Sequence, residues 1–164
     1  METVRIERIA AGGDGVGRLG DGRVVFVPRT APGDLAECRL TDAKARFARA
    51  RLHRVVEPGP GRIEPPCRHY RDDDCGGCQL QHLAAEPQRA ARRAIVGDAL
   101  RRIAKIAVGD PELVPAPADW GYRAKITLSA DRDGRLGYHR YDRPDQVFTV
   151  DRCPIAAEPL NGLL

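Results

Sequence analysis

Alternating apolar and polar positions in the first third of the chain predict short β-strands joined by glycine-rich turns. Apolar side chains alternate with polar ones around Val4–Ile6, Ala36–Leu40 and Ala48–Leu52, and residues 24–27 form a short apolar run. Successive side chains of a strand point to opposite faces, so each alternation provides one face for burial. With a further strand near Gly15–Leu19, the pattern predicts a small antiparallel five-stranded barrel over residues 1–57.

The remainder of the chain follows a different pattern. Residues 58–66 are rich in proline and glycine and are predicted to form a linker. Apolar residues at near-helical spacing then predict a helix over about residues 87–107, which Gly109-Asp110-Pro111 would end. Alternation from Arg123 to Ala130 and a turn signal at residues 131–134 predict a three-stranded meander over residues 122–150. Residues 67–164 are therefore expected to form a small α+β domain, and the fold class is mainly β with α+β.

Gly15, Gly17 and Gly20 match the G-x-G-x-x-G pattern of dinucleotide-binding folds. That function needs a helix directly after the glycines, because the helix N-terminus binds the pyrophosphate. The β-rich run at residues 24–27 follows instead, so these glycines are interpreted as turn residues of the barrel.

Composition indicates a protein without membrane spans. The 164 residues are 42% hydrophobic and 30% charged. No apolar run approaches the roughly 18 residues of a membrane span, and the first twenty residues contain no apolar signal segment. We therefore expect a cytoplasmic protein with no membrane partner.

Net charge points to a polyanionic partner. The chain carries 27 basic and 23 acidic residues, a net charge of +4. Basic residues cluster at residues 39–54 and 89–105, with a single acidic residue in each stretch. On the predicted strand that includes Ala48 and Ala50, the opposite face carries Arg49, Arg51 and His53. Aromatic and basic residues also interleave at residues 138–141, as they do in RNA-binding surfaces. The candidate RNA-binding residues are Arg46, Arg49, Arg51, His53, Arg123, Lys125, Tyr138 and Arg140.

Four of the five cysteines form a candidate metal-binding set. Cys67, Cys75 and Cys78 follow a C-x7-C-x2-C pattern, and Cys153 directly precedes a proline. A zinc ribbon usually has two C-x2-C pairs, whereas three close cysteines and a remote Cys-Pro are more typical of iron–sulfur ligation. Iron–sulfur, zinc and unligated redox-active thiols all remain open on spacing alone. Cys38 lies between apolar neighbours of a strand and is interpreted as a buried hydrophobic residue.

Several motifs resemble those of RNA uracil-C5 methyltransferases that carry an iron–sulfur cluster, and the 23S ribosomal RNA enzymes are nearest in pattern. The first module resembles a TRAM domain, an OB-like RNA-binding barrel. The resemblance rests on GGDGVGR at 12–18, VVFVP at 24–28, PGD at 32–34 and ARFARA at 45–50. The segments RIEPPCRHY at 62–70, CGGCQLQH at 75–82, WGYRAK at 120–125 and DRCPI at 151–155 resemble the cluster-binding region.

The resemblance implies that Cys67, Cys75, Cys78 and Cys153 hold a [4Fe-4S] cluster. It also implies RNA as the partner, ribosomal RNA rather than tRNA. Family members continue into a methyltransferase domain that binds S-adenosylmethionine and supplies a catalytic cysteine. No cysteine here matches that nucleophile, so we expect no catalytic residue in this chain and no methylation by it alone.

Three functional hypotheses follow. In the first, the chain is the RNA-binding and cluster-bearing portion of an RNA uracil-C5 methyltransferase. It would be either a truncated gene product or half of a split enzyme whose methyltransferase domain is encoded separately. The alternative is a stand-alone RNA-binding module stapled by an iron–sulfur cluster or by zinc. The third is electron transfer, for which the barrel and the basic stripes offer no reason.

Overall fold

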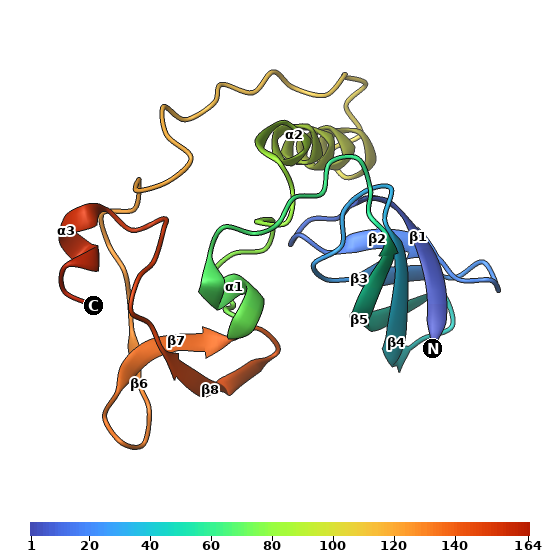
Figure 1. Cartoon of the computed structure of the whole chain (residues 1–164). Coiled ribbons are helices and arrows are strands. Elements are labelled where there is room, and N and C mark those ends of the chain that lie inside the picture. Colours follow the sequence, from blue (N-terminus) through green and yellow to red (C-terminus); the bar gives the residue numbers. More distant parts are fainter. The chain divides into compact units, whose positions relative to one another are not determined.

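A computed structural model describes all 164 residues and divides them into two compact units (Figure 1). Unit 1 comprises residues 1–64 and 82–114, and unit 2 comprises residues 65–81 and 115–164. Each unit is built from two separate stretches of sequence, so the chain passes from one unit to the other three times.

Unit 1 contains a closed barrel of five strands. These are β1 (Glu2–Ile9), β2 (Gly15–Arg18), β3 (Val24–Val27), β4 (Leu35–Ala43) and β5 (Phe47–Glu57), arranged in the order β1-β2-β3-β5-β4. The five-stranded barrel predicted from the sequence is therefore confirmed. Its expected antiparallel pairing holds except between β3 and β5, which pair in parallel with Val24 opposite Phe47. In the sequence, β4 lies between β3 and β5 and runs in the opposite direction. β3 and β5 therefore point the same way and pair in parallel as neighbours in the barrel.

Small aliphatic side chains fill the barrel. The inward positions of β1, β3 and β5 bring Val4, Ile6, Val25 and Ala48 into one cluster, which also contains Cys38, 0% exposed. A cluster of this kind stabilises the barrel through removal of apolar surface from water. At Gly17, a Cβ atom would collide with the Val4 side chain and the Arg5 carbonyl oxygen. The interpretation of these glycines as turn residues is therefore wrong for Gly15 and Gly17, which lie within β2 and allow the close packing of strands, and holds for Gly20. As expected, β3 rather than a helix follows them.

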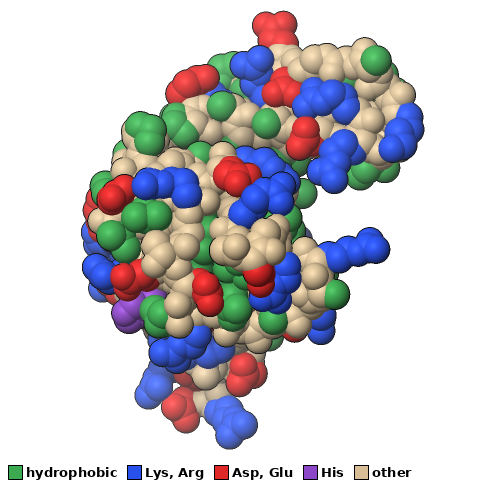
Figure 2. Space-filling model, turned by 90° about the vertical axis from the view of Figure 1, so that its right-hand side faces the viewer, with side chains coloured by type: hydrophobic (Ala, Val, Ile, Leu, Met, Phe, Trp, Pro, Cys, Tyr) green, Lys and Arg blue, Asp and Glu red, His purple; other side chains and the backbone are tan.

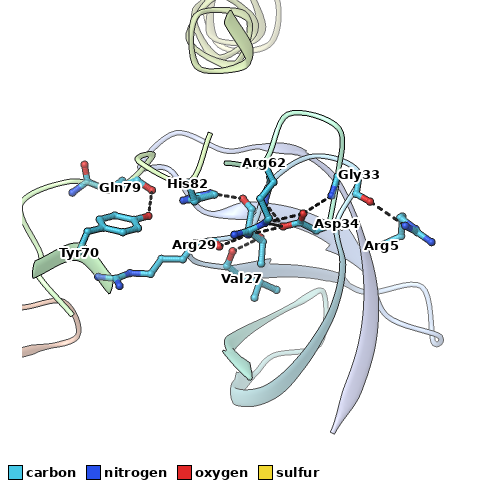
Figure 3. A network of polar contacts seen from close by, with 12 residues as sticks. Arg5, Val27, Arg29, Gly33, Asp34, Arg62, Tyr70, Gln79 and His82 are labelled. Atoms are coloured by element: carbon cyan, nitrogen blue, oxygen red, sulfur yellow. Dashed lines mark hydrogen bonds and ion pairs between the residues drawn. The ribbon is translucent and has the colours of Figure 1, made fainter. Parts of the chain in front are cut away.

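The segment after the barrel is held to it by a buried ion pair (Figure 3). The Asp34 carboxylate is 0% exposed, and Arg62 contacts it through Nη2 at 2.7 Å and Nε at 3.0 Å. Asp34 also accepts the Ala31 N–H at 2.7 Å and the Gly59 N–H at 2.8 Å. Burial alone would raise the pKa of Asp34, but the Arg62 guanidinium and the two amides outweigh it and lower that pKa. Residues 59–62, predicted as linker, are therefore fixed on the barrel.

His82 returns the chain to unit 1. Its Nε2 lies 3.0 Å from the Thr30 carbonyl oxygen, and its own carbonyl accepts the Ile63 N–H at 2.9 Å. Burial lowers the pKa of His82 to about 4, so the ring is neutral at pH 7 and donates a hydrogen bond to Thr30. A single bridge between Arg62 and Leu83 completes the attachment of this segment.

The long helix α2 (Ala85–Arg102) follows, and it is shorter than the 87–107 predicted. It ends because Lys105 adopts a left-handed φ of 59° and the N–H groups of Ile103 and Ala104 both bond to the Ala99 carbonyl. The chain then folds back, and Asp110 forms an ion pair with Arg101 at 2.8 Å. Much of the apolar face expected for this helix is exposed, including Val96 at 48%. No helix of the structure has the length and apolar character needed to cross a membrane.

Unit 2 combines short helices with a small sheet. Its elements are α1 (Arg68–Asp72), β6 (Ser129–Ala130), β7 (Leu136–Arg140), β8 (Arg143–Thr149) and α3 (Glu158–Asn161), and the strands form a sheet in the order β6-β7-β8. The first strand of the meander is two residues long, whereas alternation predicted one from Arg123. Residue 123 instead pairs in a single parallel bridge with Ala156. Alternation alone could not distinguish a strand of the meander from an extended segment that makes only a single bridge.

Candidate cysteine site and nucleic-acid-binding face

Four cysteines from three segments of unit 2 line one cavity. Cys67 precedes α1, Cys75 and Cys78 lie on the loop after it, and Cys153 follows β8. The cavity has a volume of about 40 Å³. A single water molecule needs about 10–15 Å³ on the same measure, so there is room for several atoms. Cys38 lies apart from this set, in the core of the barrel.

The loop of Cys75 and Cys78 is fixed to the sheet by backbone hydrogen bonds. The Cys75 N–H donates to the His69 carbonyl at 2.9 Å, and the Gly76 N–H donates to the His139 carbonyl at 3.1 Å. The Gly77 N–H lies 3.4 Å from the Cys75 sulfur. An amide aimed at a sulfur favours the thiolate, which is the form that binds metals.

Cys153 is held by a side chain of α3. Its N–H donates to Asn161 Oδ1 at 2.8 Å, and Asn161 Nδ2 donates in return to the Cys153 carbonyl at 3.2 Å. Cys75 and Cys153 also belong to the same apolar cluster, together with Phe148 and Val150. The remote cysteine is therefore placed beside the loop cysteines by packing as well as by hydrogen bonds.

A buried histidine connects the segment that carries Cys67 with the segment that carries Cys153. His69 lies two residues after Cys67 and is 2% exposed. Its Nδ1 is 2.7 Å from Asp73 Oδ2, and its Nε2 is 2.7 Å from Asp151 Oδ1. Because Asp151 lies two residues before Cys153, this bridge connects the segment of Cys67 to the segment of Cys153.

Burial controls the protonation of the loop thiols. It raises the pKa of Cys75 to about 11 and also raises that of Cys78. The Gln81 side chain forms a hydrogen bond with Cys78 that opposes this rise. No three of the His, Cys, Asp and Glu side chains of the chain converge closely enough to hold a single metal ion. The four thiols thus share a cavity without forming a compact one-ion site.

Three candidate RNA-binding residues of unit 2 are engaged within the unit. Tyr138 and Arg123 both line the thiol cavity, and the Tyr138 hydroxyl is hydrogen-bonded to Cys153. Burial, followed by the charge of Cys153, raises the pKa of Tyr138. Arg140 donates to the Asp73 carbonyl at 2.5 Å and lies over the Phe148 ring at 5.5 Å. Lys125 is exposed.

The candidates of unit 1 lie on the outer surface of the barrel. Arg49, Arg51 and His53 occupy exposed alternate positions of β5, and Arg46 is exposed directly before the strand. Figure 2 shows basic and acidic side chains interspersed over the side of the barrel that faces the viewer. Ion pairs such as Arg54–Glu37 at 2.6 Å and Arg5–Glu57 at 2.8 Å account for this mixture. The net positive charge is therefore not spread as a uniform patch.

Two phenylalanines beside these arginines were not expected from the sequence as functional residues. The rings of Phe26 on β3 and Phe47 on β5 meet edge to face, with centroids 6.1 Å apart and an interplanar angle of 81°. The Arg49 guanidinium lies 5.7 Å from the centre of the Phe26 ring. We call Phe26, Arg39, Phe47, Arg49 and Arg51 the β5 face. One signal was available: Phe26 alternates with the inward-facing Val25 and Val27, so it had to point outward.

Comparisons with known proteins give matches for the barrel alone and for nearly the whole chain. Residues 2–53, which contain most of the barrel, match the family model of the TRAM domain. Over 98% of its length the chain is 42% identical to an uncharacterized RNA methyltransferase of Nostoc sp. (strain PCC 7120), of which the alignment covers 35%. It is 35% identical over 99% of its length to the 23S rRNA (uracil(1939)-C(5))-methyltransferase RlmD of Pseudomonas putida, of which the alignment covers 36%.

A solved structure shows the same similarity. The tRNA (uracil-54, C5)-methyltransferase of Pyrococcus abyssi, in complex with S-adenosyl-L-homocysteine, matches with a TM-score of 0.63 and 26% identity. The match covers 99% of this chain and 34% of the archaeal one. The chain thus spans about a third of the length of the relatives it matches, and it resembles RNA methyltransferases throughout that span.

Proposed function

We propose that residues 1–164 form the RNA-holding, [4Fe-4S]-carrying portion of an RNA uracil-C5 methyltransferase. The observation that carries the proposal is the convergence of Cys67, Cys75, Cys78 and Cys153 on one cavity, in a chain that also contains a TRAM barrel. In this proposal the methyl donor S-adenosylmethionine and the reacting uracil are bound by a methyltransferase domain, on the same polypeptide or on a separate one. Residues 1–164 hold the RNA and supply no catalytic group.

The dimensions of the cavity support a cluster rather than one zinc ion. Thiolates around a single zinc lie about 3.8 Å apart, because Zn–S bonds of about 2.3 Å meet at tetrahedral angles. The cavity lined by the four thiols has room for several atoms, which is more than one zinc ion needs. When bound, a [4Fe-4S] cluster supplies four iron–thiolate bonds. Cys67, Cys75, Cys78 and Cys153 would hold it, and the Gly77 amide and Tyr138 hydroxyl would contact its sulfur ligands.

The role assigned to the cluster is structural. Cys153 lies far along the sequence from the other three cysteines, so metal bonds to all four would link the end of β8 to the loop after α1. The His69 bridge and Asn161 already bring these segments together, and the metal bonds would add to them.

The RNA partner is proposed to be ribosomal RNA. Barrels of the OB type bind nucleic acid on their outer faces, and β5 presents Arg49, Arg51 and His53 there. Similarity to RlmD of Pseudomonas putida is greater than similarity to the archaeal tRNA enzyme, which favours ribosomal RNA over tRNA. The proposed contacts are Arg46, Arg49, Arg51 and His53 on unit 1 and the exposed Lys125 on unit 2. Arg123, Tyr138 and Arg140, the other three candidates, are engaged at the thiol cavity or with Asp73 and Phe148.

Metal analysis of the chain purified without oxygen tests the cluster. We expect about four irons and four sulfides per chain with broad visible absorption. Cys153→Ser should lower the iron content, whereas Cys38→Ser, a matched change at the barrel cysteine, should leave it unchanged. About one zinc and no sulfide would overturn the cluster and leave a zinc-stapled RNA-binding module. Binding of a ribosomal RNA fragment in preference to tRNA is the accompanying test of the partner.

A further inference from the structure

The two phenylalanines of the barrel lie on its outside. The chain has three phenylalanines, and the apolar core of the barrel is built without any of them, from valine, isoleucine, leucine, alanine and cysteine. Phe47 is 36% exposed, and Phe26 is partly buried beside it. Large aromatic side chains usually add most to stability when they are buried. Their position on the β5 face therefore favours a ligand that contacts aromatic rings.

The adjoining arginines are arranged against the pairing rule of a sheet. Along β4 and β5, Glu37 faces Arg54 and Asp42 faces Arg49, so each of these pairs is of opposite charge. Arg39 faces Arg51 instead, and both side chains are exposed. Like charges directly opposite one another destabilise a sheet. Arg39 has no acidic partner within 4.0 Å, which leaves it available to an anion.

The two features share one side of the barrel. Phe47, Arg49 and Arg51 alternate along β5, so their side chains leave the same face of the strand. Phe26 is the neighbour of Arg49 on β3, and Arg39 is the neighbour of Arg51 on β4. Aromatic rings and paired arginines therefore form a continuous strip across β3, β5 and β4. Phe47 and Arg51 lie four residues apart, which is about 13 Å along a strand.

We propose that the β5 face binds an unpaired segment of RNA, in which a base stacks on Phe47, whose ring is supported by the edge-to-face contact with Phe26, and a neighbouring phosphate contacts Arg39 and Arg51. This inference rests on the proposed RNA-holding function and adds the form of RNA that is held. Every base has a face that can stack on an aromatic ring, and a base within a duplex is not free to do so. Arg49, which already lies over the Phe26 ring, extends the stacking surface.

The test measures binding of the full, metal-loaded chain to labelled RNA by fluorescence anisotropy at several salt concentrations. The probes are a single-stranded oligouridylate and an RNA duplex of the same length. The double variant Phe26→Leu/Phe47→Leu keeps apolar side chains and removes the rings. We expect it to bind the single strand about 5- to 150-fold more weakly, as stacking of one base predicts. Its salt dependence should be unchanged, because no charge is removed.

The arginine pair gives the complementary result. In Arg39→Ala/Arg51→Ala, the slope of log affinity against log salt should become shallower by about 0.7 for the single strand, because one phosphate is no longer neutralised. Arg8→Ala, an exposed arginine on β1 that has no acidic partner within 4.0 Å, is the matched control and should leave the slope nearly unchanged. Thermal unfolding checks that each variant is folded. Phe47→Leu alone carries the stacking test if the double variant is unfolded.

The outcomes separate this inference from the proposed function. If the wild-type chain binds neither RNA, the RNA-holding function fails and this inference with it. If the wild-type chain binds RNA but the phenylalanine variants match it on the single strand, only the stacking site is overturned. An equal weakening on the duplex would also overturn it, because the rings would then act without an unpaired base.

Discussion

Removing the carboxylate of Asp34 should destabilise unit 1 more than any change of a surface ion pair. Asp34 is fully buried, and Arg62 beside it has a side chain only 18% exposed. Asp34→Ala would leave the guanidinium without its counter-charge and the Ala31 and Gly59 N–H groups without an acceptor. Removal of one partner of a buried ion pair costs about 3–5 kcal/mol of unfolding free energy. This is a large share of the roughly 5–15 kcal/mol that stabilises a typical domain.

Urea unfolding of the full chain, followed by far-UV circular dichroism, measures this destabilisation. Native-state hydrogen exchange locates it, and the barrel strands should lose protection before β7 and β8 do. Asp34→Asn keeps an acceptor oxygen for one of the two amides and should fall between Ala and the wild type. Glu37→Gln is the matched control, because its partner Arg54 lies at the surface with a side chain 59% exposed. A decrease in free energy below about 1 kcal/mol for Asp34→Ala would refute the reasoning, since that is the range of surface pairs.

Three further predictions concern acid, metal and packing. Because the pKa of His82 falls from 6.5 to about 4 on folding, the unfolded chain binds more protons between these values, and stability is lost as pH falls through that window. The decrease should reach about 3 kcal/mol in urea titrations and disappear in His82→Gln. If the proposed cluster is present, iron chelation should lower the thermal stability of unit 2; circular dichroism and melting unchanged after chelation would contradict the structural role proposed for the cluster. Gly17→Ala should cost about 1–3 kcal/mol in urea unfolding because its Cβ meets Val4, whereas Gly20→Ala, with open space around it, should be tolerated.

The sequence was most informative where the pattern of apolar residues fitted only one type of secondary structure. Alternation along Val4–Ile6 and Ala36–Leu40 identified strands whose inward residues do fill the barrel. It could not show that β3 and β5 pair in parallel, because the direction of a partner strand leaves no mark on side-chain alternation. Nor did the spacing of apolar residues reveal where α2 ends, since the left-handed backbone at Lys105 is not encoded by a glycine or proline.

The sequence predicted which cysteines come together, but it did not predict which other side chains hold them in place. The spacing grouped Cys67, Cys75, Cys78 and Cys153, and the structure places all four around one cavity. The bridge from His69 to Asp151 spans 82 positions of sequence, and nothing local connects those two residues. Tyr138 was assigned to RNA because it alternates with basic residues, yet its hydroxyl faces Cys153. A charge pattern cannot distinguish a residue that faces RNA from one that faces a cavity.

The discontinuous make-up of the two units sets an order for their synthesis. Cys67, Cys75 and Cys78 are translated first, and 75 positions separate Cys78 from Cys153. At about 5–20 residues per second, the ribosome takes about 4–15 s to cover that distance. During this interval the nascent chain completes the segment that returns to the barrel, residues 82–114, while the cavity still lacks one thiol. Unit 1 can therefore be finished before unit 2, and a four-thiol site is assembled only in a chain whose barrel has already been made.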